Sequence, residues 1–307
     1  MKVLGLSAGN AGGSAEILLK EALRGAQEVG ATPELVRIGD LDLATGPRAR
    51  TDDAQWFWDR LMESDGLLVS SPIYTRTLPG VLRLLGDTIS GPQADVVFTA
   101  ELLRLRATGA DIAVDFPIDE RVLKPRVAGF LAVGGSLPAS WKTLALPLMH
   151  TLTASAQIAV VDQAEFAGAG SPSSIVLDPG ALARASRLGR NVGEQLGRPF
   201  DEVEYRGEPG ACPVCHLSVV ALRGGTAAEC AVCGAAGRLR VGGGEVFLDV
   251  EPAGLARSVI SVEEKHAHFR EVQETAARHA PHRAEIERRK AEYLAWDPRI
   301  TPDRRAT

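Results

Sequence analysis

An α/β fold with a doubly wound, five-stranded parallel sheet is predicted for roughly the first 200 residues of this 307-residue chain. Short apolar runs alternate there with helical patterns of about ten to eighteen residues. The run 126–133 is apolar almost throughout, as in a parallel strand that is covered on both faces. Segments rich in Ser, Thr, Gly or Pro follow the first, third and fourth strands. Such segments meet at the carboxyl edge of a parallel sheet, where doubly wound folds bind ligands.

The chain opens with a strand (2–6), a loop of small residues (7–15) and an amphipathic helix that Gly30 is expected to end. The loop matches neither the Walker pattern nor G-x-G-x-x-G. It carries no Lys or Arg, so it would hold an anion by backbone N–H groups, hydroxyls and the helix dipole. The alternative is a glycine-rich turn that only reverses the chain.

The later elements follow the same alternation. Before residue 90 we expect a strand at 33–38, a loop at 41–51 with Gly46-Pro47, a helix at about 52–64 capped by Asp52 and Asp53, a strand at 65–70 and a helix at 78–89. After residue 125 we expect a strand at 126–133, a helix at 139–155, a strand at 158–161 and a closing helix at 181–196. Residues 91–125 interrupt this order and contain a possible helix at 93–107. This insertion is interpreted as a lid or a dimerisation element.

The composition is that of a soluble globular protein, with 45% hydrophobic and 24% charged residues. A net charge of −5 gives no reason to expect binding to nucleic acid or to a membrane surface. No apolar run approaches the ~20 residues of a membrane span, and no export signal precedes the first strand. A cytoplasmic location is therefore expected.

All four cysteines of the chain form two Cys-x-x-Cys pairs, Cys212/Cys215 and Cys230/Cys233. With short strands expected at 217–222, 237–241 and 246–250, this predicts a zinc ribbon at 206–251 that is stabilised by its metal. Four protein ligands leave no position open for substrate, so the zinc would be structural. Rubredoxin-like iron and a pair of redox disulfides are less favoured, iron because aromatic residues are few here. Nucleic-acid binding by the ribbon is also less favoured, because the basic residues are few.

Residues 252–307 are expected to form a helical extension, with helices at about 262–280 and 282–295. Charge is dense and mixed, as on a solvated or partner-facing helix. The histidines of this extension are interpreted as solvent-facing, because Pro281 disrupts a regular ligand spacing. Its apolar residues could dock on another subunit: Phe269, Val272, Tyr293, Leu294 and Trp296.

Three ordered segments carry a resemblance to a known family. They are Val3–Ala8 with Gly13–Leu23, then Asp65-Gly66 with Ser71–Tyr74, then Val133–Ser136 with Leu148–His150. Over about residues 1–163 the chain resembles the NADPH-dependent FMN reductase-like branch of the flavodoxin superfamily, and more narrowly the relatives of iron–sulfur flavoproteins. It departs from them in two ways. No cysteine lies at 41–53, where those relatives hold a cluster, and Asn10-Ala11 stands where they often carry Arg.

The resemblance implies a flavodoxin-like domain at 1–200 that binds one FMN. Its phosphate would be surrounded by Ser7, Gly9, Asn10, Gly13, Ser14 and Ala15, and its ring bordered by Pro72, Ile73, Tyr74, Thr75 and Arg76 on one side and by Gly134, Gly135 and Ser136 on the other. Tyr74 and Arg76 are the possible catalytic side chains, with packing under the loop and solvation as their respective alternatives. His150 is interpreted as a packing residue.

The function that the resemblance implies is electron transfer from NAD(P)H through the flavin to a small organic acceptor, such as a quinone, a nitro or azo compound or a biosynthetic intermediate. A homodimer or homotetramer is expected. One alternative is a non-enzymatic electron-transfer or redox-sensing flavoprotein that uses the ribbon to dock a partner. Another is a nucleic-acid-associated module that has lost its flavin.

Overall fold

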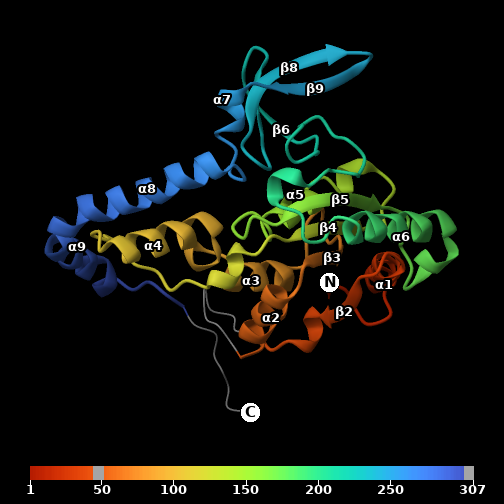
Figure 1. The fold of residues 1–307 in the computed structure, drawn as a ribbon, viewed down its shortest axis with the longest axis horizontal. Coiled ribbons are helices and arrows are strands. Elements are labelled where there is room, and N and C mark those ends of the chain that lie inside the picture. Colours follow the sequence, from red (N-terminus) through yellow and green to blue (C-terminus); the bar gives the residue numbers. More distant parts are fainter. Residues whose placement is uncertain (44–51, 301–307) are drawn as a thin grey trace.

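The computed structural model describes residues 1–43 and 52–300. Its larger part is a parallel five-stranded sheet with the order β2-β1-β3-β4-β5 (Figure 1). The strands are β1 (Lys2–Ser7), β2 (Thr32–Arg37), β3 (Gly66–Pro72), β4 (Val127–Val133) and β5 (Ala159–Phe166). The flavodoxin-like α/β prediction is thus confirmed. The Gly46-Pro47 loop and the capping role of Asp52 lie outside what the structure describes.

Helices cover both faces of the sheet, each over its own apolar core. One face carries α1 (Ser14–Glu28) and α6 (Pro179–Gly193), and the other α2 (Asp52–Glu63), α3 (Gly80–Ile89) and α5 (Ala145–His150). Helices α1 and α6 approach closely, since a Cβ added to Gly189 would lie 1.7 Å from the carbonyl oxygen of Ala22. The predicted end of the first helix is confirmed, because Gly30 follows it with φ +94°.

The long helix predicted at 139–155 is wrong. The structure has a 3₁₀ turn at Ala139–Trp141, the short α5, and then turns up to β5. Two hydroxyls bond back to the backbone and replace helical pairing: Thr151 Oγ1 donates to the Leu148 carbonyl (2.7 Å) and Thr153 Oγ1 to that of His150 (3.1 Å). The strand expected at 158–161 is also too short, because β5 continues to Phe166.

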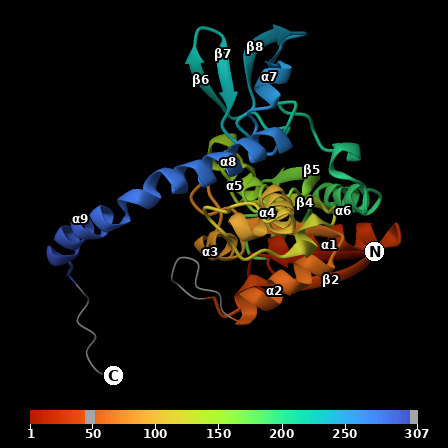
Figure 2. The same ribbon diagram turned by 60° about the vertical axis from the view of Figure 1, so that its left-hand side comes forward.

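The insertion contains the predicted helix as α4 (Val96–Thr108), which Asp95 caps by accepting from Val97 N (2.8 Å) and Phe98 N (3.1 Å). Helix α4 packs against α8 (Val262–His279) through Phe98, Leu102 and Phe269. The insertion therefore holds the C-terminal extension, in which α9 (Arg283–Ala295) follows α8 and projects away from the sheet (Figures 1 and 2). Both helices predicted for the extension are confirmed.

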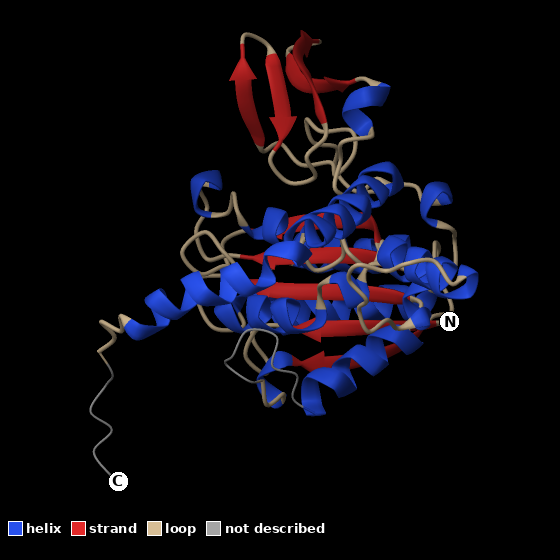
Figure 3. Cartoon of the chain, turned by 90° about the vertical axis from the view of Figure 1, so that its left-hand side faces the viewer, coloured by secondary structure: helices blue, strands red, loops and turns tan. Residues whose placement is uncertain are grey.

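The cysteine module is an antiparallel sheet that lies beyond the β5 edge of the main sheet (Figure 3). Its strands are β6 (Val220–Gly224), β7 (Ala227–Cys230), β8 (Ala236–Gly242) and β9 (Glu245–Val250), and α7 (Pro252–Leu255) follows. Strand β7 was not predicted, and β6 begins three residues after the expected position 217. Among the helices of the described residues, none combines the length and the apolar character that crossing a lipid bilayer requires.

Candidate active site and metal centre

The three loops singled out in the sequence follow neighbouring strands and lie at one edge of the sheet. Ser7 of β1 is in register with Ser70 of β3, and Pro72 of β3 with Val133 of β4. A hydrogen bond from Ile73 N to the Val133 carbonyl (2.8 Å) continues the pairing beyond the strands. The carboxyl edge therefore brings together the segments 7–15, 71–77 and 134–136.

The first loop is folded as an open cradle. Ala8 N donates to the Ser70 carbonyl (2.9 Å) and Gly13 N to the Asn10 carbonyl (2.9 Å), whereas the N–H groups of residues 9–12 make no hydrogen bond with any described residue. A Cβ on Gly9 would lie 3.1 Å from the Cβ of Ala15 and narrow the cradle. The Ser7 hydroxyl is buried and has no hydrogen-bond partner within the described part of the chain. Free donors and a buried hydroxyl before a helix N-terminus fit a phosphate group.

A buried ion pair supports the same helix end, and sequence reasoning missed it. Glu16, in the first turn of α1, is fully buried and lies 2.6 Å from Arg37 Nε and 2.6 Å from Lys20 Nζ. Hydrogen bonds from Arg37 are the main cause that lowers the pKa of the Glu16 carboxyl to about 2. The only sequence signal is a Glu at a position that α1 buries. Because Arg37 is neutralised by Glu16, it does not take the place of the basic residue that the loop lacks.

The second loop is a tight turn in which Tyr74 N and Thr77 N each donate to the other residue's carbonyl (2.9 and 3.0 Å). Thr75 and Arg76 have left-handed φ values of 46° and 74°, which cost energy in residues other than glycine. The Arg76 guanidinium donates to Thr143 Oγ1 (2.8 Å) in the segment after β4. Arg76 thus connects the second loop to the segment after β4 by a hydrogen bond. The Tyr74 residue is 55% exposed.

The third loop is held from two sides. Gly134 N donates to the Phe166 carbonyl (2.8 Å) of β5, and a Cβ on Gly135 would lie 3.0 Å from the Cα of Gly170. Ser136 is exposed. The segment after β5 also closes on the first loop, because Ser173 Oγ donates to the Gly12 carbonyl (2.7 Å). Sequence reasoning missed this fourth segment, the residues after β5 that include Ser173. In the sequence it lies between the third loop and the cysteine module, where no site was expected.

His150 is a packing residue, as predicted. It is buried, its ring meets Phe130 edge-on at 5.3 Å, and its Nε2 lies 2.8 Å from Gln163 Oε1. Burial lowers the pKa of His150 below its usual value, so the neutral imidazole is favoured at neutral pH.

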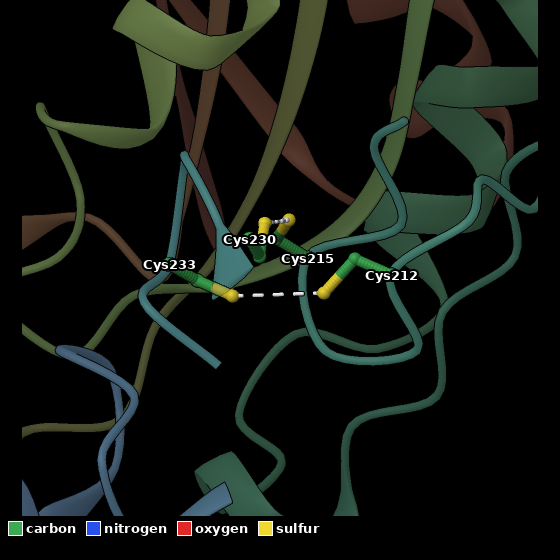
Figure 4. Close-up of side chains that lie close together, drawn as sticks. All are labelled: Cys212, Cys215, Cys230 and Cys233. Carbon is green, nitrogen blue, oxygen red and sulfur yellow. Dashed lines mark hydrogen bonds between the residues drawn. The ribbon is translucent and has the colours of Figure 1, made fainter. Parts of the chain in front are cut away.

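The four cysteines form one compact cluster (Figure 4), with all their Sγ atoms within 4.8 Å of one another. The Sγ atoms of Cys212 and Cys233 are 3.7 Å apart, and those of Cys215 and Cys230 are 3.4 Å apart. All four cysteines are buried, and none of them forms a disulfide. Sulfurs that bind one ion tetrahedrally at about 2.3 Å lie about 3.8 Å apart. The geometry therefore fits a four-coordinate metal site of the zinc-ribbon type.

Comparison with known proteins agrees with this geometry. Residues 1–171 match the family model described as NADPH-dependent FMN reductase. The chain is 35% identical over 264 residues to flavone synthase cfoJ of Aspergillus candidus, with 79% of each protein covered. A solved structure described as a flavone reductase superposes with a TM-score of 0.83 at 28% identity, covering 99% of this chain and 100% of that one. The flavone reductase match includes the ribbon and nearly all of the C-terminal extension.

Proposed function

Because this chain belongs to the NADPH-dependent FMN reductase family, we propose that it acts on the C2–C3 bond of a flavone or its dihydro form. The chain is an NAD(P)H-dependent FMN oxidoreductase. One relative is named for making flavones and the other for reducing them, so a flavone is what the two names share. A flavone is also a small organic acceptor in the sense of the sequence prediction, because its C2–C3 double bond is conjugated with a ketone.

The observation that supports the cofactor site is the cradle of free N–H groups with the buried Ser7 hydroxyl. We propose that this loop holds the FMN phosphate through Ser7, Gly9, Asn10, Gly13, Ser14 and Ala15. The two other loops would border the ring. Those residues are Pro72, Ile73, Tyr74, Thr75 and Arg76 on one side and Gly134, Gly135 and Ser136 on the other. Bound FMN supplies the exchange of a hydride with the nicotinamide and with the substrate. Arg76, fixed by Thr143, would place positive charge at the rim of this site.

In the reducing direction, NAD(P)H, one proton and a flavone give NAD(P)⁺ and the dihydro compound. One carbon of the double bond gains the hydride and the other gains the proton. Making a flavone removes a hydride and a proton, which together are two electrons and two protons, from C2 and C3 of the dihydro form and needs an oxidant such as O₂. The family's dependence on NADPH favours the reducing direction.

The test follows absorption of the FMN-loaded protein under anaerobic conditions. We expect NADPH to bleach the flavin absorption and the flavone apigenin to restore it, with a product two mass units heavier. Protein that FMN cannot reconstitute would contradict the cofactor site. Bleached protein that menadione reoxidises but apigenin does not would contradict the substrate.

We also propose that the cysteine cluster holds structural zinc, because its four ligands complete a tetrahedron without substrate. The division into domains at 1–200, 206–251 and 252–307, the homodimer or homotetramer and the cytoplasmic location stay predictions.

A further inference from the structure

The ribbon is fixed to the edge strand β5 by specific contacts. Gln163 Nε2 of β5 donates to the Cys215 carbonyl (2.8 Å), and Gln163 Oε1 lies 2.8 Å from His150 Nε2. The His216 ring stacks on Tyr205, with 3.7 Å between ring centroids and 10° between planes. The first cysteine pair therefore has a defined position relative to β5 and to α5.

A cavity of about 790 Å³ lies between the ribbon and the main domain. Its walls come from the segment before α5 and α5 itself, from β5 with the start of α6, and from the ribbon with the chain that leads to it. The lining residues include Ala139, Thr143, Leu146, Glu165, Phe166 and Val219. A cavity of this size is sufficient for a molecule of about twenty heavy atoms.

The cavity adjoins the loops of the proposed flavin site, although none of the residues 7–15, 71–77 and 134–136 lines it. Two of its lining residues bond directly to the loops that border that site: the Phe166 carbonyl accepts from Gly134 N (2.8 Å), and Thr143 Oγ1 accepts from Arg76 (2.8 Å). A ligand in this cavity would therefore lie next to the ring side of the carboxyl edge.

A second cavity, of about 460 Å³, lies on the other side of the His216–Tyr205 stack. It is lined by Ile158 and Ala159, at the start of β5, and by the segment before α8. The start of a parallel strand lies opposite the carboxyl edge, so this second cavity is remote from the flavin loops.

The walls of the larger cavity suit a planar phenolic ketone. Leu146, Phe166 and Val219 contribute apolar groups to the lining. The polar and charged side chains include those of Glu165, Asp178, Arg184, Tyr205 and Glu208. The Phe166 carbonyl points to β4, so by alternation the N–H of Glu165 lies on the free edge of β5. Partial desolvation raises the pKa of the Glu165 carboxyl, against the opposing effect of Lys142.

We propose that this cavity binds the flavone and that the ribbon supplies its outer wall. The inference rests on the function proposed above and assigns the cysteine module to substrate recognition instead of partner docking. It also gives a reason for the ribbon to be fixed to β5: the wall must stay at a constant distance from the flavin loops.

The test compares two substitutions of the same kind within the ribbon. Val219→Trp fills the cavity from its outer wall, whereas Val246→Trp places the same side chain on β9, where Val246 is 54% exposed and lines neither cavity. Binding of apigenin to the oxidised, FMN-loaded protein is measured by calorimetry, and FMN affinity is measured separately. We expect Val219→Trp to weaken apigenin binding about tenfold or more, with FMN affinity unchanged, and Val246→Trp to change neither.

The outcomes separate this inference from the proposed function. Wild-type protein that binds FMN but not apigenin would overturn the substrate class and the cavity assignment with it. Equal apigenin affinity in wild type and Val219→Trp, with turnover of the flavone intact, would overturn the cavity assignment alone. If Val219→Trp does not fold, Ala139→Trp narrows the cavity from the opposite wall, where Ala139 is exposed, and the same loss of affinity is expected.

Discussion

Ser14 stands at the first position of α1, directly after the open loop. Ser14→Asp would place a carboxylate against the proposed phosphate, so we expect FMN affinity to fall by about tenfold or more. Folding should not suffer, because a negative charge is favourable at a helix N-terminus. Fluorescence titration of FMN into apoprotein measures the effect, with Ser14→Ala as the neutral control. Unchanged affinity in Ser14→Asp would mean that the phosphate lies elsewhere.

Glu16 gives the same helix end a dependence on pH. Its pKa is about 2 in the folded protein and near its usual 4.5 in the unfolded chain, so its stabilisation is complete above pH 4.5 and is lost as pH falls towards 2. We expect Glu16→Gln to lower the free energy of unfolding by roughly 1–3 kcal/mol at pH 7. The variant should lose less stability than wild type between pH 5 and 3.

Urea unfolding at pH 7 and pH 3 measures this difference. Glu21→Gln on the same helix is the matched control. Glu21 forms an ion pair with the exposed Arg24, and surface ion pairs contribute little to the free energy of unfolding. An equal loss of stability on acidification in Glu16→Gln and wild type would show that other groups cause it.

The same helix shows what the sequence can predict and what it cannot. The stripe of apolar residues predicts which face of α1 is buried, but Glu16 lies on that face too, at 0% exposure. Its partner Arg37 is at the end of another strand, and only the parallel pairing of β1 with β2 brings them together. A contact of this kind depends on strand order, which local periodicity does not contain.

At the scale of elements, the strands and loops of the carboxyl edge were predictable and α5 was not. Strand β4 is apolar at nearly every position because both of its faces are covered, so its sequence is unambiguous. The segment 139–155 has a helical pattern of apolar residues, yet hydroxyl groups after His150 bond to the last carbonyls and end the helix early. Strand β7 is short and contains two alanines and a cysteine, so it shows little strand preference.

The ribbon is the element whose folding depends most on a ligand. Its core consists mainly of the four cysteines with Ala228, Ala235 and Leu248, which is too small to be stable without metal. We expect elemental analysis to find about one zinc per chain. Removing the metal with a chelator should make hydrogen exchange fast at 212–250 while the main sheet stays protected. Iron instead of zinc, or a ribbon that stays protected after metal removal, would contradict the assignment.

The buried side chain of Arg126 connects helix α2 to the segment that precedes β4. It is almost fully buried, and its guanidinium donates to the carbonyls of Leu61 (3.1 Å), Lys124 (2.8 Å) and Arg121 (3.0 Å). Burial lowers the pKa of Arg126 to about 10, so it stays charged at neutral pH. We expect Arg126→Met to lower stability by about 2–4 kcal/mol, because it leaves buried carbonyls without donors. Thermal unfolding measures this, with Arg24→Met on α1, where the Arg24 side chain is 71% exposed, as the control.

For the whole molecule, the ribbon and the C-terminal helices are held at separate places on the main domain. The ribbon is bonded to β5 through Gln163. The extension is bonded through Lys265 of α8, whose Nζ donates to the Ser155 carbonyl (3.0 Å) and lies 3.5 Å from Asp95 Oδ2. Asp95 in turn caps α4, so one buried amine joins the insertion, the extension and the turn before β5. The sequence predicted each of these segments, but it contained no signal that they meet.

Lys265 therefore offers a test of this arrangement. Burial lowers the pKa of its ammonium group, with Asp95 opposing the shift, and its side chain is only 6% exposed. We expect Lys265→Met to speed hydrogen exchange in α8 about tenfold or more, because the carbonyls of Ala154 and Ser155 both lose the ammonium donor. Lys290→Met, on the exposed α9, should leave exchange in α8 unchanged. The flavin loops are distant from α8, so FMN affinity should be the same in both variants. Unchanged exchange in Lys265→Met would mean that the other contacts, among them the Phe98–Phe269 ring pair and the two Gln273–Val114 hydrogen bonds, hold α8 without Lys265.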